Sequence, residues 1–231
     1  MALDMNNFTS NQKEQSAVKS NRKLRIGIIG TGGISGSHIP AYLRQEDVEL
    51  VAGCDLIPGK AESKFRYYKI EGGKFFTDYK EMIDTVEMDA VSVCTYNSTH
   101  AECAIYALEH GLNVLLEKPF TVTLEEAAAV MRAEKKSGKF VSVGFQPRFD
   151  ANMQMIKKIV QSGELGRVFY VQTGGGRRHG IPVSWTDTFI QKDKAGLGAV
   201  GDIGCYSIDL VMNALNNPKP LTVSGTVSDY F

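Results

Sequence analysis

A glycine-rich segment follows the first apolar run of the sequence. The run Leu24–Gly30 (LRIGIIG) is typical of a buried parallel strand, because it is short and apolar and ends in glycine. The next segment, Gly30–Ser35 (GTGGIS), follows the pattern GxGxxG except that serine replaces the third glycine. Such a loop lets the backbone approach a pyrophosphate at the N-terminus of the next helix, although a purely structural glycine turn is an alternative. The residues that we predict to bind a dinucleotide here are Gly30, Thr31, Gly32, Gly33 and Ile34.

An acidic residue lies near the spacing expected for contact with the ribose of that dinucleotide. Asp55 closes the second apolar run, Glu49–Cys54, about 25 residues after Gly30, where ~20 is usual. Its carboxylate can accept hydrogen bonds from both ribose hydroxyls and would repel a 2′-phosphate. We therefore expect NAD rather than NADP, although Lys60 and Lys64 lie nearby and leave NADP possible.

A lysine follows a later strand and lies at the same edge of the expected sheet. Lys118 comes after the run Asn113–Leu116, within Glu117-Lys118-Pro119. Ligands of parallel sheets bind at the carboxyl ends of the strands. A partly desolvated lysine there could bridge cofactor and substrate hydroxyls, whereas the alternative is a solvated surface lysine. Arg148 follows the expected sixth strand, Phe140–Gly144, in the same way and could hold a substrate hydroxyl or a phosphate.

Asp202 and Tyr206 are four residues apart in a segment that opens a helix, so we expect both side chains on one face. A carboxylate is favoured at a helix start by the helix dipole, so Asp202 could be only a cap, and Tyr206 could be a core aromatic. An unperturbed tyrosine has a pKa near ~10. Its phenol would carry a proton near neutrality only if a cation such as Lys118 lowered that pKa.

Strands and helices alternate over about 120 residues, which indicates a parallel sheet with helices on both faces. The fold class that we expect is α/β, a Rossmann-type doubly wound parallel sheet followed by the start of a second α+β domain with an open sheet, apparently truncated. In that second part, Arg167–Gln172 and Leu221–Tyr230 are expected strands and Ile203–Leu215 an expected helix. The expected divisions are a mobile tail at 1–22, a dinucleotide-binding domain at 23–146 and a partial substrate or dimerisation domain at 147–231.

Composition narrows the classes of function. The 26 basic and 26 acidic residues cancel, so no global charge draws the chain to nucleic acid or to an anionic membrane. The N-terminal segment has no apolar core of a signal peptide, and no run reaches the ~18 apolar residues of a membrane span. The four cysteines form no CxxC pair. Buried reduced thiols, no metal site and a cytoplasmic location are therefore expected.

Four segments together resemble the glucose–fructose oxidoreductase / inositol dehydrogenase / MocA family of NAD(P)-dependent oxidoreductases, from Leu24 to the end of the chain. The segments are GIIGTGGIS after residue 26, Thr95–His100 (TYNSTH), Glu117–Pro119 (EKP) and Gly201–Asp209 (GDIGCYSID). The resemblance implies a Rossmann domain joined to an α/β domain with an open sheet, and a cis peptide bond before Pro119. It also implies action on sugars, cyclitols or related polyols. Many relatives have histidine where this chain has Tyr206, and tyrosine resembles the glucose–fructose oxidoreductase branch.

The same resemblance extends the candidate site. It implies that the loop after the fourth strand lines the dinucleotide groove, although His100 could be only the first turn of a helix. It also suggests that the loop with Arg177, Arg178 and Trp185 reaches over the nicotinamide. The added cofactor-binding residues are Thr95, Asn97, His100, Glu117 and Lys118. The substrate-binding residues are Lys118, Arg148, Arg178, Asp202 and Tyr206. The catalytic residues are Lys118, Asp202 and Tyr206.

The function that these residues indicate is hydride transfer between a nicotinamide and a sugar, cyclitol or related carbonyl compound. Lys118 and Tyr206 would carry the proton, and Asp202 would orient substrate and tyrosine. The alternatives are a cofactor-binding regulator of the same fold without turnover, and an NAD-dependent glycosidase. Family members are longer than this chain, so activity of this short form stays open, and we expect a homo-oligomer if the second domain is complete.

Overall fold

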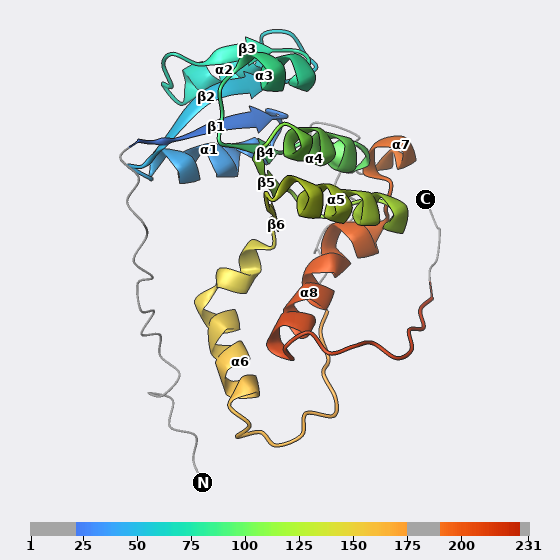
Figure 1. Ribbon diagram of the computed structural model, residues 1–231. Coiled ribbons are helices and arrows are strands. Elements are labelled where there is room, and N and C mark those ends of the chain that lie inside the picture. Colours follow the sequence, from blue (N-terminus) through green and yellow to red (C-terminus); the bar gives the residue numbers. More distant parts are fainter. Residues whose placement is uncertain (1–21, 175–189, 227–231) are drawn as a thin grey trace. The chain divides into compact units, whose positions relative to one another are not determined.

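The computed structural model describes residues 22–174 and 190–226 of the 231-residue chain. These residues form two units, a sheet unit and a helical unit (Figure 1). The sheet unit contains residues 22–145 and 190–205. The helical unit contains residues 146–174 and 206–226.

The sheet unit is built on six parallel strands in the order β3-β2-β1-β4-β5-β6. The strand order reverses between β1 and β4, and such a switch point opens a crevice at the carboxyl ends of the strands. This arrangement confirms the predicted doubly wound parallel sheet. The strands are β1 Leu24–Ile29, β2 Val48–Cys54, β3 Lys74–Phe76, β4 Ala90–Val93, β5 Asn113–Leu116 and β6 Val141–Val143.

Helices cover both faces of this sheet because right-handed crossovers on either side of the switch point put their helices on opposite faces. One apolar core gathers around Ile28, with Ile39 from α1 and Phe65 from α2. The other gathers around Ile29 and the helices α3, α4 and α5, and α4 lies beside α5 (Figure 1). The helices are α1 Ser35–Leu43, α2 Lys60–Tyr67, α3 Tyr79–Thr85, α4 His100–Glu109 and α5 Leu124–Ser137.

Local sequence signals set the ends of α5. Thr123 accepts a hydrogen bond from the N–H of Glu126, and the Glu126 carboxylate accepts one from the N–H of Thr123, which is a complete capping box. Gly138 follows the helix with a φ of 67°, a left-handed conformation that glycine adopts without a steric penalty. Both ends of α5 are therefore set by residues next to the helix in sequence.

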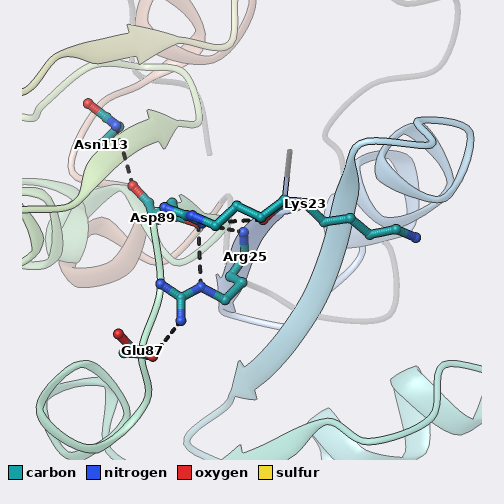
Figure 2. Close-up of polar contacts among 6 residues, drawn as sticks. Lys23, Arg25, Glu87, Asp89 and Asn113 are labelled. Atoms are coloured by element: carbon teal, nitrogen blue, oxygen red, sulfur yellow. Dashed lines mark hydrogen bonds and ion pairs between the residues drawn. The ribbon is translucent and has the colours of Figure 1, made fainter. Parts of the chain in front are cut away.

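A cluster of charged residues lies at the amino edge of the sheet, and Figure 2 shows the polar contacts among Arg25, Glu87, Asp89 and Asn113. Asp89, just before β4, accepts hydrogen bonds from the Arg25 N–H at 2.8 Å and from both Arg22 guanidinium nitrogens at 2.6 and 2.7 Å. Its own carbonyl accepts from the Asn113 side chain, and Arg25 also pairs with Glu87. The hydrogen bonds from Arg22 and Arg25 hold the pKa of Asp89 well below its usual range. The cluster therefore ties together the starts of β1, β4 and β5.

Three further short elements belong to the sheet unit, one of which is the 3-10 helix Asn97–Thr99. The helix α7 is Lys192–Ala195, and a π-helical turn spans Val200–Gly204. Asp202 therefore lies in a π-turn that precedes α8, Cys205–Ala214, and the predicted helix start at Ile203 was two residues too early.

The helical unit contains α6 (Ala151–Gln161) and most of α8, but no strand among its described residues. The predicted strand Arg167–Gln172 is wrong, and the described part of Leu221–Tyr230, residues 221–226, is also irregular; residues 227–230 lie outside the described ranges. Alternating apolar residues form a strand only when a neighbouring strand accepts the backbone hydrogen bonds. No described segment of this unit does so for either one.

One helical stretch, Lys192–Ala214, has the length and composition that a membrane-spanning helix would need, although the sequence predicted no such stretch. Core helices of globular proteins satisfy the same two criteria, so this stretch decides nothing about a membrane.

We predict that Asp89→Asn lowers the free energy of unfolding by about 1 to 2 kcal/mol at neutral pH, because it removes a charged acceptor of three hydrogen bonds. The folded-state pKa of Asp89 is lowered, so its stabilisation is present above its ordinary pKa of ~3.9 and is lost as the pH falls below that value. Urea unfolding at neutral pH and near pH 3 measures both effects. Asp47→Asn, at an exposed carboxylate, is the control, and equal losses in the two variants would contradict the prediction.

Candidate active site

The glycine loop after β1 leaves room for a ligand at the start of α1. Gly30 has a φ of 86°, and a Cβ there would lie 2.6 Å from the Cys94 carbonyl oxygen, so β1 and β4 approach closely only around glycine. A Cβ at Gly32 or Gly33 would meet no atom within 4 Å. Ser35, in place of the third glycine, is fully buried and its hydroxyl donates to the Gly32 carbonyl at 2.7 Å. The loop therefore keeps an open backbone cradle at a helix N-terminus, which suits a pyrophosphate.

Asp55 lies beside this loop, and its carboxylate is held by protein donors. Thr31 donates to Asp55 Oδ2 from its N–H at 2.9 Å and from its hydroxyl at 2.8 Å. Lys60 Nζ lies 3.0 Å from the same oxygen, and the Ile57 N–H donates to Oδ1. Burial alone would raise the pKa of Asp55, but these hydrogen bonds outweigh it and lower the pKa. Thr31, predicted to bind cofactor, is itself 1% exposed and serves to fix Asp55.

Lys118 and Asp202 meet within the sheet unit although they are far apart in sequence. Lys118 Nζ donates to Asp202 Oδ1 at 2.9 Å and to the Asp202 carbonyl at 2.9 Å. Their side chains are 15% and 14% exposed, so the pair is largely shielded from water. The peptide bond before Pro119 is cis, as the family resemblance implied. The sequence predicted both residues for the site, and the structure brings them together.

Segment 190–205, which carries Asp202, also contacts the loop after β4. The Asn97 side-chain amide donates to the Ala195 carbonyl at 2.8 Å. Gly196 packs against Val122, where a Cβ would lie 2.6 Å from two methyl groups. Asn97 therefore anchors α7, a contact that the sequence did not predict.

His100 lies under the cis peptide and is fully buried. Its Nδ1 lies 2.8 Å from the Pro119 carbonyl oxygen, and burial lowers the pKa of its imidazole. A side chain without solvent contact favours the structural alternative for His100, the first turn of a helix, over a cofactor contact. Thr95, half-exposed before the same helix, has its hydroxyl 3.4 Å from the Tyr96 carbonyl oxygen.

Glu117 is also buried, and its partners were not among the predicted contacts. His38 Nε2 lies 2.6 Å from Glu117 Oε1, and the Lys118 N–H donates to Glu117 Oε2 at 3.1 Å. Ser92 Oγ lies 3.2 Å from His38 Nδ1 and 2.6 Å from the Tyr42 hydroxyl. The signal that could have revealed this cluster is the four-residue spacing of His38 and Tyr42, which puts both on one face of α1.

Two further candidate residues belong to the helical unit. Arg148 forms a two-pronged ion pair with Asp209, so both Nε and Nη2 of its guanidinium contact protein. The Tyr206 hydroxyl accepts a hydrogen bond from the Gln146 amide at 3.2 Å. Arg177, Arg178 and Trp185 lie outside the described residues, as does the predicted tail apart from residue 22.

The cysteines agree with the prediction of reduced thiols. All four are free, and three of them are buried, while Cys205 is half-buried. Burial raises the pKa of the Cys54 and Cys103 thiols to about 12. Among the described residues no group of three or more His, Cys, Asp or Glu side chains could hold a metal ion.

Comparison with known families now identifies the fold. Residues 24–145 match the model of the oxidoreductase family with an NAD-binding Rossmann fold, and residues 153–230 match the GFO/IDH/MocA C-terminal domain. The chain belongs to the GFO/IDH/MocA oxidoreductase family. The predicted family and the NAD-binding Rossmann fold are thereby confirmed.

Relatives in this family have named activities. D-glucoside 3-dehydrogenase of Escherichia coli K12 is 33% identical over 202 residues, which cover 87% of this chain and 56% of that protein. Inositol 2-dehydrogenase of Salmonella paratyphi B is 35% identical over 150 residues, 64% of this chain and 44% of that protein. The aldose-aldose oxidoreductase of Caulobacter crescentus, solved with glycerol, is 31% identical with a TM-score of 0.74 over 84% of this chain and 58% of that one. The chain thus spans about half the length of these relatives.

We predict that Asp55 sets the choice between NAD and NADP. Asp55→Asn keeps the size of the side chain but removes the charge that repels a 2′-phosphate, so the ratio of NAD to NADP affinity should fall about tenfold, or ~1.4 kcal/mol. Calorimetric titration with both cofactors measures the ratio.

Thr31→Val is the matched control for this prediction. It removes one hydrogen bond to Asp55 but leaves the charge, so it should weaken both cofactors alike. An unchanged ratio in Asp55→Asn, or tighter binding of NADP than of NAD by the unaltered chain, would contradict the assignment.

Proposed function

We propose that this protein transfers hydride between NAD and a hydroxyl-bearing carbon of a sugar, cyclitol or related polyol. The observation that carries the proposal is the shielded pair of Lys118 and Asp202, which lies at the same carboxyl edge of the sheet as the open phosphate cradle after β1. The names of the relatives, glucoside 3-dehydrogenase, inositol 2-dehydrogenase and aldose-aldose oxidoreductase, support a polyol as substrate.

The residues of this chain fit the nicotinamide dinucleotide. Backbone N–H groups at the start of α1 would hold the pyrophosphate, and Asp55 would face the ribose. When bound, the nicotinamide accepts or gives the hydride. Gly32 and Gly33, over which the space is open, are the residues that allow this approach.

Lys118 and Asp202 have complementary parts in the proposed reaction. An ammonium group shielded from water can hold the oxygen of a carbinol or carbonyl and can donate a proton to a carbonyl oxygen as that carbonyl is reduced. In the reverse direction the neutral amine would accept the proton of the carbinol. Asp202 fixes the position of that ammonium group through two hydrogen bonds from Nζ. Tyr206 is proposed as the further proton carrier, and Gln146 orients its hydroxyl.

The rest of the assignment follows from the same proposal. Residues 23–146 would form the dinucleotide domain and 147–231 part of a substrate and dimerisation domain, in a homo-oligomer. The four free thiols support a cytoplasmic location.

We predict that Lys118→Met lowers turnover by at least ~10²-fold while the fold persists, because the change removes the ammonium group but keeps the alkyl stem. Turnover of NAD with a panel of polyols, together with saturation-transfer NMR of both ligands, measures this. Lys136→Met, at an exposed lysine of α5, is the control. If the Lys118→Met protein kept the kcat of the unaltered protein, the proposed catalytic role of Lys118 would be contradicted. If the unaltered protein bound NAD but turned over no polyol, the alternative function, a cofactor-binding regulator without turnover, would be favoured.

A separate prediction concerns Tyr206. If its hydroxyl carries the proton, Tyr206→Phe should lower kcat by ~10²–10⁴-fold with little change in cofactor affinity. Tyr206→His should restore part of that rate, since imidazole titrates near neutrality and can take the same proton. Tyr170→Phe, at an exposed tyrosine of the helical unit, is the control. An unaltered rate in Tyr206→Phe would make Tyr206 a structural aromatic.

A further inference from the structure

A hydrogen-bonded network of polar side chains connects α1 to the backbone of Lys118. Tyr42 and His38 come from α1, Ser92 from β4, and Glu117 from the end of β5. The side chains of His38 and Glu117 are 9% and 10% exposed, and Ser92 is fully buried. These contacts thus lead through the sheet unit from α1 to the residue that precedes Lys118.

The directions of these hydrogen bonds follow from the chemistry of the groups. An ionised carboxylate only accepts, so His38 Nε2 carries the proton toward Glu117 Oε1. When His38 Nδ1 carries no proton, it accepts from the Ser92 hydroxyl, and Ser92 Oγ then accepts from the Tyr42 hydroxyl. Every side-chain donor in this network therefore has an acceptor, which is the condition for a stable buried polar network.

The carboxylate of Glu117 depends on His38. A buried carboxylate is costly unless hydrogen-bond donors compensate for lost water, and His38 is the side-chain donor that the structure gives to Oε1. The other oxygen accepts the Lys118 N–H. Space for the carboxylate comes from Gly144 after β6, where a Cβ would lie 3.1 Å from Glu117 Oε1.

We propose that His38 is a positioning residue for Lys118: by holding Glu117, it fixes the turn from which the Lys118 side chain reaches Asp202. The inference rests on the proposed function, because it concerns the same lysine. His38 touches neither Lys118 nor Asp202 in any described contact, so its effect runs through the Glu117 carboxylate. It also joins the helix that would hold the pyrophosphate to the strand end that carries the lysine.

Two substitutions of His38 separate the contact with Glu117 from mere packing. Glutamine places an amide N–H near the position of Nε2 and can still donate to Glu117. Asparagine is shorter and reaches only the neighbourhood of Nδ1, where Ser92 lies. His110→Asn, at a partly exposed histidine whose Nδ1 lies near the Tyr106 carbonyl of its own helix, is the matched control.

The first measurement does not depend on activity. The backbone amide signal of Lys118, and its rate of hydrogen exchange, report the hydrogen bond to Glu117 by NMR of the full chain without cofactor. We expect His38→Asn to shift this signal and accelerate exchange at least tenfold relative to neighbouring amides, and His38→Gln and His110→Asn to leave both unchanged. An unchanged Lys118 amide in His38→Asn would overturn the proposal.

The second measurement is turnover with NAD and a polyol. Displacing a reacting group by about 1 Å can cost ~10²-fold, so we expect kcat to fall 10- to 100-fold in His38→Asn and to return to within about threefold in His38→Gln. An altered amide with unaltered kcat would overturn the link to Lys118. If the unaltered chain turned over no polyol, the proposed function would fail, while the amide still decided the positioning claim.

A second variant covers the case in which His38→Asn does not fold. Ser92→Ala removes the partner of His38 Nδ1 and leaves the imidazole in place. We expect it to shift the Lys118 amide in the same direction by a smaller amount. No shift in a folded Ser92→Ala together with none in Glu117→Gln would overturn the proposal.

Discussion

The candidate site depends on the return of segment 190–205 to the carboxyl edge of the sheet. The ion pair between Lys118 and Asp202 secures this return, and the hydrogen bond from Asn97 to the Ala195 carbonyl and the close packing of Gly196 on Val122 accompany it. A shielded ion pair gains little net stability, because the loss of water offsets most of the attraction. Its value is the fixed geometry of an ammonium group at the strand ends.

The carboxylates at this edge of the sheet are hydrogen-bonded by other groups of the protein. Thr31 and Lys60 hold Asp55, and His38 and the Lys118 N–H hold Glu117. Each carboxylate thus has a set orientation before any ligand arrives, which lowers the reorganisation needed when a ligand binds. At Gly32 and Gly33 there is no side chain, so the space above them is open and only the backbone can contact a phosphate.

The amino edge of the sheet carries a stabilising charged cluster, whereas the carboxyl edge carries the candidate site. At the amino edge, Asp89 collects donors from Arg22 and Arg25 and joins the starts of three strands. At the carboxyl edge, the reversal of strand order between β1 and β4 opens the crevice, and Gly30 allows the two strands to approach. Parallel sheets favour this division because all strand ends of one kind meet at one edge.

The sequence by itself determined the six strands, the five helices between them and the phosphate loop, because short apolar runs, caps and glycines are local signals. It also placed Lys118 and Asp202 in one site by resemblance to a family. Tertiary structure alone decided the partners of the charged side chains: Thr31 for Asp55, His38 for Glu117 and Asp209 for Arg148. It also decided that Arg167–Gln172 is not a strand, since a strand needs a neighbour that local sequence cannot supply. Such pairings join residues far apart in the chain, and no spacing rule reports them.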